Sequence, residues 1–280
     1  MPKNPLIHIP RSLPVVQNLA IQSKQVLKSL RSFDVMQWEG TAYGSLPQQM
    51  MNIYELNDLA PRDGWPTVLM IHGGGWVSGS PLSMAHIAPL FARKGIMACS
   101  MQYRLAPEFR WPAQAQDVHA ALDFLLSQQV DPTRIALWGF SAGAHLAIHA
   151  AHTYPHPLAA VVAIAPPTNL HALPFEDLQA CFSQEDLKEA SVMNIEKKLP
   201  PTLIIHGSAD TTFPIEHSRS FAQQREEVTL WEVEHGNHGI HWPFLAGRKA
   251  KKDAISWLVE TLDLPRRGSK WRRSKKKHNK

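Results

Sequence analysis

Short apolar runs alternate with helical segments from about residue 34 onward, and this rhythm constrains the fold more than any other feature. Runs of strand length cover 66–72, 96–103, 135–139, 158–165, 202–206 and 228–233. Segments with helical spacing cover 84–94, 113–129, 142–151 and 249–262, and Asp131-Pro-Thr-Arg134 is a turn. Strands that alternate with helices predict a mostly parallel sheet with helices on both faces.

Two segments fall outside this rhythm. Residues 1–33 carry apolar residues at near-helical spacing between Gln17 and Arg31, and residues 166–200 form a mixed polar and apolar excursion between two predicted strands. Each is predicted as a lid element, with surface helices packed on the core as the alternative. The predicted organisation is an N-terminal extension or lid helix at 1–33, the main domain at 34–264 and a tail at 265–280.

Basic residues are concentrated at the C-terminus. The chain has a formal net charge of +5, from 29 Lys and Arg against 24 Asp and Glu, and nine of those bases lie in the last sixteen residues. Without them the chain is mildly acidic. We expect residues 265–280 to be a disordered basic tail that either contacts anionic lipid or nucleic acid or only adds solubility.

Cysteine use and the N-terminus indicate a protein that is not exported. Cys99 and Cys181 lie far apart and give no disulfide framework, and Cys99 is expected to be a small buried residue. Prolines interrupt residues 1–10, which lack the apolar region of a secretory signal, and no apolar stretch reaches membrane-spanning length. We expect a cytoplasmic location. The sequence does not predict an oligomeric state.

A serine lies at the junction between a predicted strand and a predicted helix. Gly139-Phe-Ser-Ala-Gly143 ends one apolar run and precedes an Ala-rich helix. This setting is typical of a nucleophile elbow, in which a sharp turn raises the serine hydroxyl above the carboxyl edge of the sheet. Small residues at Gly139, Ala142 and Gly143 permit the strained backbone. Ser141 is therefore the candidate nucleophile, and it needs a base.

A second glycine motif follows the predicted strand at 66–72. In His72-Gly-Gly-Gly-Trp76, three glycines leave backbone N–H groups open to a ligand. Such groups stabilise the oxyanion that forms when a serine attacks a carbonyl, by about 3–4 kcal/mol per donor. The N–H of Ala142, at a helix start, is a further donor. A phosphate loop or a plain turn is the alternative, but neither G-x-G-x-x-G nor a following Lys-Ser or Lys-Thr is present.

Together these motifs resemble the esterases of the hormone-sensitive-lipase type and the neighbouring bacterial feruloyl-esterase and acetylxylan-esterase-like α/β-hydrolases. The similar stretches lie between residues 34 and 262 and are Tyr43-Gly-Ser, His72-Gly-Gly-Gly-Trp76, Tyr103-Arg-Leu-Ala-Pro-Glu108, Trp111-Pro-Ala, 137–147, His206-Gly-Ser-Ala-Asp210 and His238-Gly. The resemblance implies an α/β-hydrolase fold, oxyanion donors at Gly74, Gly75 and Ala142, and a bracing role for residues 103–108. Many relatives carry a glycine where this chain has Ala144, whose methyl group we expect to tighten helix packing.

The acid that orients the catalytic histidine is predicted from its place after a strand. In this fold the chain order is serine, acid, histidine, with the last two on loops after later strands. Asp210 follows the run 202–206 and the turn Gly-Ser-Ala. The competing acids are assigned to the solvated excursion or to a helix start after Pro214, and they are Glu176, Asp177, Glu185, Asp186 and Glu216.

Three histidines compete for the role of general base: His235, His238 and His241. His238 precedes a glycine as in the resembling family and lies late enough in its loop to turn back toward Ser141, so we favour it over His235 and then His241. The spacing also suggests zinc, but no signature such as H-E-x-x-H is present. We expect no metal and no cofactor, and we expect His145 and His149 to be packing or surface residues.

These residues predict a serine hydrolase that cleaves carboxylic esters through an acyl-enzyme, and the resemblance implies short acyl chains. The expected partner is a small-molecule ester, with the acyl and alcohol groups not fixed by the sequence. The resemblance also implies a pocket lined by residues 1–33 and 166–200, and Trp111 and Trp242 are expected either in an aromatic wall or in the core. An arylformamidase, which cleaves an N-formyl amide, and a non-catalytic ligand-binding protein on the same fold are the alternatives.

Overall fold

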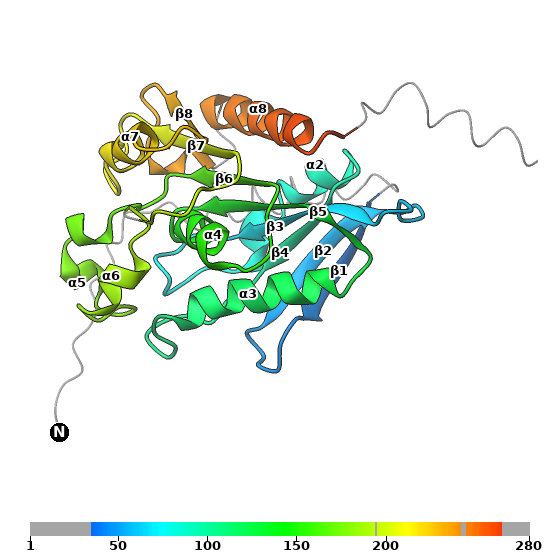
Figure 1. Ribbon diagram of the computed structural model, residues 1–280, viewed down its shortest axis with the longest axis horizontal. Helices are drawn as coiled ribbons and strands as arrows, with labels where there is room; N and C mark the ends of the chain where they lie inside the picture. Colours follow the sequence, from blue (N-terminus) through cyan, green and yellow to red (C-terminus); the bar gives the residue numbers. More distant parts are fainter. Residues whose placement is uncertain (1–34, 194, 242–244, 265–280) are drawn as a thin grey trace, which may run out of the picture.

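A computed structural model describes residues 35–193, 195–241 and 245–264. Within these residues one sheet has the strand order β1-β2-β4-β3-β5-β6-β7-β8 (Figure 1). Strands β3 to β8 run parallel to one another, whereas β2 is antiparallel to both of its neighbours, β1 and β4. The predicted mostly parallel sheet is thereby confirmed. The strands are β1 (Val35–Ala42), β2 (Met50–Leu56), β3 (Trp65–Ile71), β4 (Met97–Met101), β5 (Val130–Phe140), β6 (Ala160–Ile164), β7 (Thr202–Gly207) and β8 (Val228–Val233).

Helices cover both faces of the sheet (Figure 1). On one face α3 (Ala113–Leu126) and α4 (Ala142–Thr153) share an apolar cluster with Phe221 of α7 (Glu216–Gln223). On the other face α2 (Ala88–Ala92) and α8 (Leu245–Thr261) share a second cluster. Strands β3, β4, β6 and β7 are buried at every residue. This double cover is why these strands have apolar runs without alternation.

The first two strands lie in a region where the sequence analysis assigned no element. Strand β1 is an edge strand whose residues are exposed or half-buried, and it pairs only with β2. Strand β2 then pairs antiparallel with β4. A half-exposed edge strand carries a weak apolar signal, because packing on only one side selects few of its residues.

The predicted helix at 84–94 is shorter than expected. The chain forms a 3-10 helix, η1 (Pro81–Met84), before α2 begins. Pro89 lies in the first turn of α2, where its missing N–H costs no hydrogen bond. The same residue in the middle of a longer helix would break the backbone ladder. Proline therefore sets the start of this helix.

The predicted turn at Asp131–Arg134 lies inside β5. The pairing of β5 with β3 shifts from Trp65 opposite Val130 to Thr67 opposite Ile135, so extra residues bulge from the strand. Asp131 Oδ1 accepts hydrogen bonds from the N–H and the hydroxyl of Thr133 at 2.9 and 2.6 Å. The turn chemistry is thus present, but the strand continues through it as a bulge.

The excursion between β6 and β7 packs on the body of the domain. It contains η2 (Leu170–Ala172), α5 (Phe175–Leu178) and α6 (Asp186–Ala190). Phe182 is fully buried in the cluster below α3 and α4, and the N–H of Trp111 donates to the carbonyl of Cys181 at 2.9 Å. Trp111 itself is a core residue. A lid role for 166–200 stays a prediction.

Several predictions concern residues outside the described ranges. These are the lid helix at 1–33, the aromatic residue Trp242 and the basic tail at 265–280. In the part of the chain that the structure describes, none of the helices combines the length and the apolar character that crossing a membrane requires. Cys99 is fully buried in β4, as expected for a small core residue.

Candidate active site

Ser141 occupies a tight turn between β5 and α4. Its backbone has φ 54° and ψ −122°, a strained conformation that a non-glycine residue adopts only where the surroundings impose it. The Ser141 N–H donates to the carbonyl of Ile164 in β6 at 2.8 Å. The turn also needs Gly143, because a Cβ added there would lie 2.1 Å from the carbonyl oxygen of Ile71. The start of α4 therefore packs directly on the end of β3.

A hydrogen-bonded chain links Ser141 to His238 and Asp210. Ser141 Oγ lies 3.0 Å from His238 Nε2, and His238 Nδ1 lies 2.7 Å from Asp210 Oδ2. Asp210 follows β7, and His238 starts the 3-10 helix η3 (His238–His241) after β8. Because parallel strands end at the same edge of a sheet, loops far apart in sequence meet here.

The competing histidines are placed differently. The side chain of His235 is 89% exposed and lies near Glu234, whereas that of His238 is 20% exposed. His241 is the last residue of η3. Among the described side chains, no three His, Cys, Asp or Glu residues lie close enough together to hold a metal ion. The imidazole that meets Ser141 is thus that of His238.

The competing acids lie elsewhere. Glu176, Asp177 and Glu185 are exposed on the excursion, and Asp186 is bound to the N–H of Ser183. Glu216 is the first residue of α7, as predicted, and pairs with Arg219. The acid that meets His238 is therefore Asp210.

The carboxylate of Asp210 is buried and fully hydrogen-bonded. Oδ2 faces His238 and also His206 Nε2 at 3.1 Å, while Oδ1 accepts the N–H groups of Thr212 and Phe213 at 2.8 and 3.0 Å. Burial by itself would raise the pKa of Asp210, but the hydrogen bonds from His206 and His238 hold it far below its ordinary value. The carboxylate is therefore ionised at neutral pH.

Two aromatic rings enclose the imidazole of His238. The ring centroids of Phe140 and Phe213 both lie 5.2 Å from that of His238, one tilted and one edge-on. Phe140 directly precedes Ser141, and Phe213 follows Asp210 by three residues. The rings restrict the imidazole to orientations that keep its two nitrogens toward the serine and the acid.

The glycine loop after β3 runs beside Ser141. A Cβ added at Gly73 would lie 3.1 Å from Ser141 Cβ. Gly74 has φ 121°, which favours glycine, and its carbonyl accepts the N–H groups of Val77 and Ser78. Within the described residues, no acceptor pairs with the N–H of Gly74, Gly75 or Ala142. Unpaired amides beside a serine hydroxyl are the groups that an oxyanion needs.

The stretch 103–108 holds both ends of this glycine loop. The buried Tyr103 hydroxyl donates to the carbonyl of His72 at 3.1 Å, and its ring stacks on the imidazole at 4.3 Å. The N–H of Ala106 donates to the carbonyl of Trp76 at 2.9 Å. Burial lowers the pKa of His72 to about 4, so this histidine is neutral. Arg104 pairs with the buried Asp117 of α3 at 2.8 Å, which anchors the stretch to the helix layer.

Sequence reasoning missed three residues behind Asp210. His206 is the penultimate residue of β7, Phe213 lies in the following loop and Ser218 lies in α7. His206 bonds to all three of Asp210, the Phe213 carbonyl and the Ser218 hydroxyl. In the sequence His206 is a histidine at the end of an apolar run, four residues before the predicted acid, and that position alone assigns it no role.

His145 and His149 are packing residues, one of the two expected outcomes. Both are buried on α4, and both rings pack against Trp111. His145 Nε2 also lies 2.7 Å from the carbonyl of Ala190, so it ties α4 to the excursion. Burial lowers the pKa of His145 to about 4.

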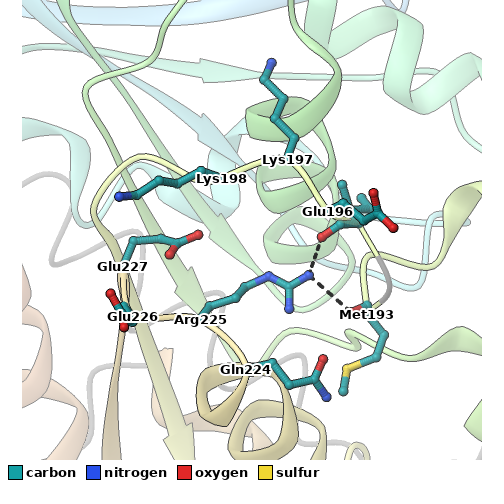
Figure 2. Close-up of a pocket in the computed structure, with 9 residues that line it drawn as sticks. Met193, Glu196, Lys197, Lys198, Gln224, Arg225, Glu226 and Glu227 are labelled. Atoms are coloured by element: carbon teal, nitrogen blue, oxygen red, sulfur yellow. Dashed lines mark hydrogen bonds between the residues drawn. The ribbon is translucent and has the colours of Figure 1, made fainter.

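A separate hollow lies at the opposite edge of the sheet, where β7 and β8 begin (Figure 2). It is about 560 Å³ in volume, large enough for a small molecule, but two of its charged side chains bond to the backbone of the chain itself. Arg225 donates to the carbonyls of Met193 and Ile195, and Glu227 accepts the N–H of Leu199. Strand β7 has six residues, which places the hollow about 20 Å from Asp210. We assign it no part in the chemistry at Ser141.

Comparison with known proteins identifies related sequences and folds. Esterase LipC of Mycobacterium tuberculosis is 28% identical over 236 residues, which cover 71% of this chain and 58% of LipC. The chain thus spans little more than half the length of that relative. The solved structure of Thermogutta terrifontis esterase 2 is 26% identical, with a TM-score of 0.72, and the match covers 81% of this chain and 96% of that one.

A second solved structure has the same fold. A truncated carbohydrate esterase from gut microbiota matches with a TM-score of 0.72 at 23% identity, over 83% of this chain and 98% of that one. The family model named BD-FAE matches residues 51–224, which is more than half of the 280 residues. The matched range begins in β2 and ends directly after α7, so it includes Ser141 and Asp210. The chain therefore belongs to the BD-FAE family and is an α/β-hydrolase of the group that its motifs resemble.

Proposed function

We propose that this protein is a serine hydrolase that cleaves short-chain carboxylic esters through an acyl-enzyme. The observation that carries the proposal is the hydrogen-bonded chain from Ser141 through His238 to Asp210, with separations of 3.0 and 2.7 Å. The relatives named as esterases support the same reaction class.

Acylation begins with attack of Ser141 Oγ on the ester carbonyl carbon. His238 Nε2 takes the hydroxyl proton as the bond from oxygen to carbon forms, and Asp210 stabilises the resulting imidazolium. The carbonyl oxygen becomes an oxyanion and accepts hydrogen bonds from the N–H groups of Gly74, Gly75 and Ala142. The bond to the alcohol oxygen then breaks, and His238 returns the proton to the leaving alcohol.

Deacylation repeats these steps with water as the nucleophile. His238 takes a proton from water, the resulting oxygen bonds to the acyl carbon, and the same amides hold the second oxyanion. The bond to Ser141 Oγ breaks, and His238 protonates the serine as the carboxylic acid leaves. The ionised state of Asp210 supports this role, because only a carboxylate stabilises the imidazolium of both half-reactions.

Aromatic packing behind the glycine loop supports a small acyl group. Trp76 follows the loop and is 2% exposed, and its ring packs edge-on against Phe182 and His145. His145 lies one helical turn after Ser141. Rings therefore pack behind the glycine loop and one helical turn from the nucleophile, an arrangement that favours a short acyl chain.

Labelling with a fluorophosphonate tests the nucleophile. We expect the probe to modify Ser141, and Ser141→Ala to lose both labelling and turnover of p-nitrophenyl acetate. Ser127→Ala, at an exposed serine after α3, is the matched control and should behave as wild type. Rates on p-nitrophenyl esters of increasing chain length and on N-formylkynurenine then define the substrate. Folded wild-type protein that neither labels nor turns over any of these would refute the proposal.

A further inference from the structure

The carboxylate of Asp210 accepts a hydrogen bond from a second imidazole, besides the one from His238. Oδ2 accepts from His238 Nδ1 at 2.7 Å and from His206 Nε2 at 3.1 Å. Oδ1 accepts two backbone N–H groups. Each oxygen therefore has two donors, which is the full set that a carboxylate accepts in one plane. Such a set fixes the rotation of the carboxylate about its Cβ–Cγ bond.

The surroundings of His206 determine where its hydrogen lies. The side chain is fully buried, and Nε2 faces Asp210 Oδ2 and, at 2.9 Å, the carbonyl oxygen of Phe213. Neither oxygen can donate, so Nε2 must carry the hydrogen. Nδ1 lies 2.7 Å from the hydroxyl oxygen of Ser218, within hydrogen-bond distance. The ring is thus held from both sides.

We propose that His206 is a positioning residue for the reaction at Ser141. By donating Nε2–H to the oxygen that also accepts from His238, it keeps the Asp210 carboxylate in the plane that directs the His238 imidazole toward Ser141. Ser218 fixes His206 in turn, so the positioning network begins in α7 and ends at the nucleophile. This inference rests on the proposed ester hydrolysis.

Other charged groups near His206 do not replace this donor. His217 on α7 accepts a hydrogen bond from the N–H of Asn169 and does not bond to Asp210. Glu232, opposite His206 on β8, is paired with Arg219 at 2.6 Å. Without His206, Asp210 Oδ2 would keep only the hydrogen bond from His238. The carbonyl of Phe213 would lose the hydrogen bond from His206. The hydrogen bond from His206 also helps to lower the pKa of Asp210.

Two substitutions separate the positioning role from simple packing. In His206→Gln, the side-chain nitrogen lies as many bonds from the backbone as Nε2 does, so the donor to Asp210 is retained. In His206→Asn, the polar atom lies at the place of Nδ1, so contact with Ser218 is retained and the donor to Asp210 is lost. His217→Asn, at a buried histidine without a bond to Asp210, is the matched control.

We expect His206→Asn to lower kcat about ten- to a hundredfold, the range for loss of one hydrogen bond to a charged group. KM should change little, because His206 does not reach the substrate. The acid limb of the kcat/KM profile should move to higher pH, since a carboxylate with fewer donors holds the imidazolium more strongly. His206→Gln should restore most of kcat, and His217→Asn should leave it near wild type. Equal kcat values in His206→Asn and wild type would overturn the inference.

A readout that needs no turnover separates this inference from the proposed function. The proton between His238 Nδ1 and Asp210 gives a low-field NMR resonance that can be assigned with 15N-labelled histidine. It should shift or broaden in His206→Asn and be retained in His206→Gln. An unchanged resonance in His206→Asn would overturn the inference even if wild type hydrolyses esters. If His206→Asn does not fold, Ser218→Ala replaces it as the test. This change removes the hydroxyl beside His206 Nδ1 and should lower kcat several-fold. A wild-type kcat in Ser218→Ala would overturn the inference.

Discussion

Replacing Gly143 by alanine should push the glycine loop after β3 away from the start of α4. These two segments carry the proposed oxyanion donors. Gly143 lies in the first turn of α4, directly after Ala142, and faces the end of β3, which leads into the glycine loop. A Cβ at this position would lie 2.1 Å from the carbonyl oxygen of Ile71 and 2.4 Å from that of His72. Both atoms belong to the backbone, so neither moves away by a simple side-chain rotation.

The size of the effect follows from these distances. An ordinary contact begins at 3.4 Å, so the strand end and the helix start must move apart by about 1 Å. Overpacking of this kind costs about 1–3 kcal/mol of stability. A displacement of about 1 Å at catalytic groups costs roughly a hundredfold in rate. We therefore expect kcat of Gly143→Ala to fall about a hundredfold in a protein that still folds.

Ala144→Gly is the matched control for this prediction. The residue is the next in the same helical turn and is fully buried, and the change removes a methyl group without pushing on β3. It should cost about 1–2 kcal/mol of stability while kcat stays near wild type. Urea unfolding and kcat measured on both variants compare the two effects. Wild-type kcat in folded Gly143→Ala, or an equal loss of kcat in Ala144→Gly, would refute the reasoning.

Three further predictions test other parts of the molecule. Asp210→Asn should lower kcat about 10⁴-fold, because the amide stabilises the wrong tautomer of His238, and should also lower the urea midpoint, because the amide NH2 must face donors that now bond to a carboxylate oxygen. Burial lowers the pKa of His145 from 6.5 to about 4, so the unfolded chain binds a proton first as the pH falls. The free energy of unfolding should therefore be highest above pH 6.5 and decrease toward pH 4, by about 2 kcal/mol at pH 5 from this residue alone; an equally steep decrease in His145→Gln would contradict this. Arg225→Lys should lower the free energy of unfolding by about 1–2 kcal/mol with kcat unchanged, and a lower kcat would show that the hollow at the opposite edge takes part in turnover.

The sequence predicted the parallel part of the sheet because its signals are local. A strand buried on both faces needs a continuous apolar run, and β3, β5 and β7 each have one. The edge strand β1 and its neighbour β2 have only a partial apolar pattern, since both keep exposed or half-buried residues. The bulge in β5 escaped prediction for a related reason. The same residues form a turn in isolation and a bulge when a neighbouring strand continues beside them.

By itself, the sequence determined the candidate residues of the site, because each follows a predicted strand and parallel strands end at one edge. It did not decide which histidine meets Ser141, since His235 and His238 share a loop and only its folded path separates an exposed ring from an enclosed one. It also gave no role to His206, which reads as one more residue of a strand. That role depends on α7 bringing Ser218 to one side of the ring while the loop brings Asp210 to the other. Such a contact between elements is set by packing in three dimensions, and no local pattern in the chain encodes it.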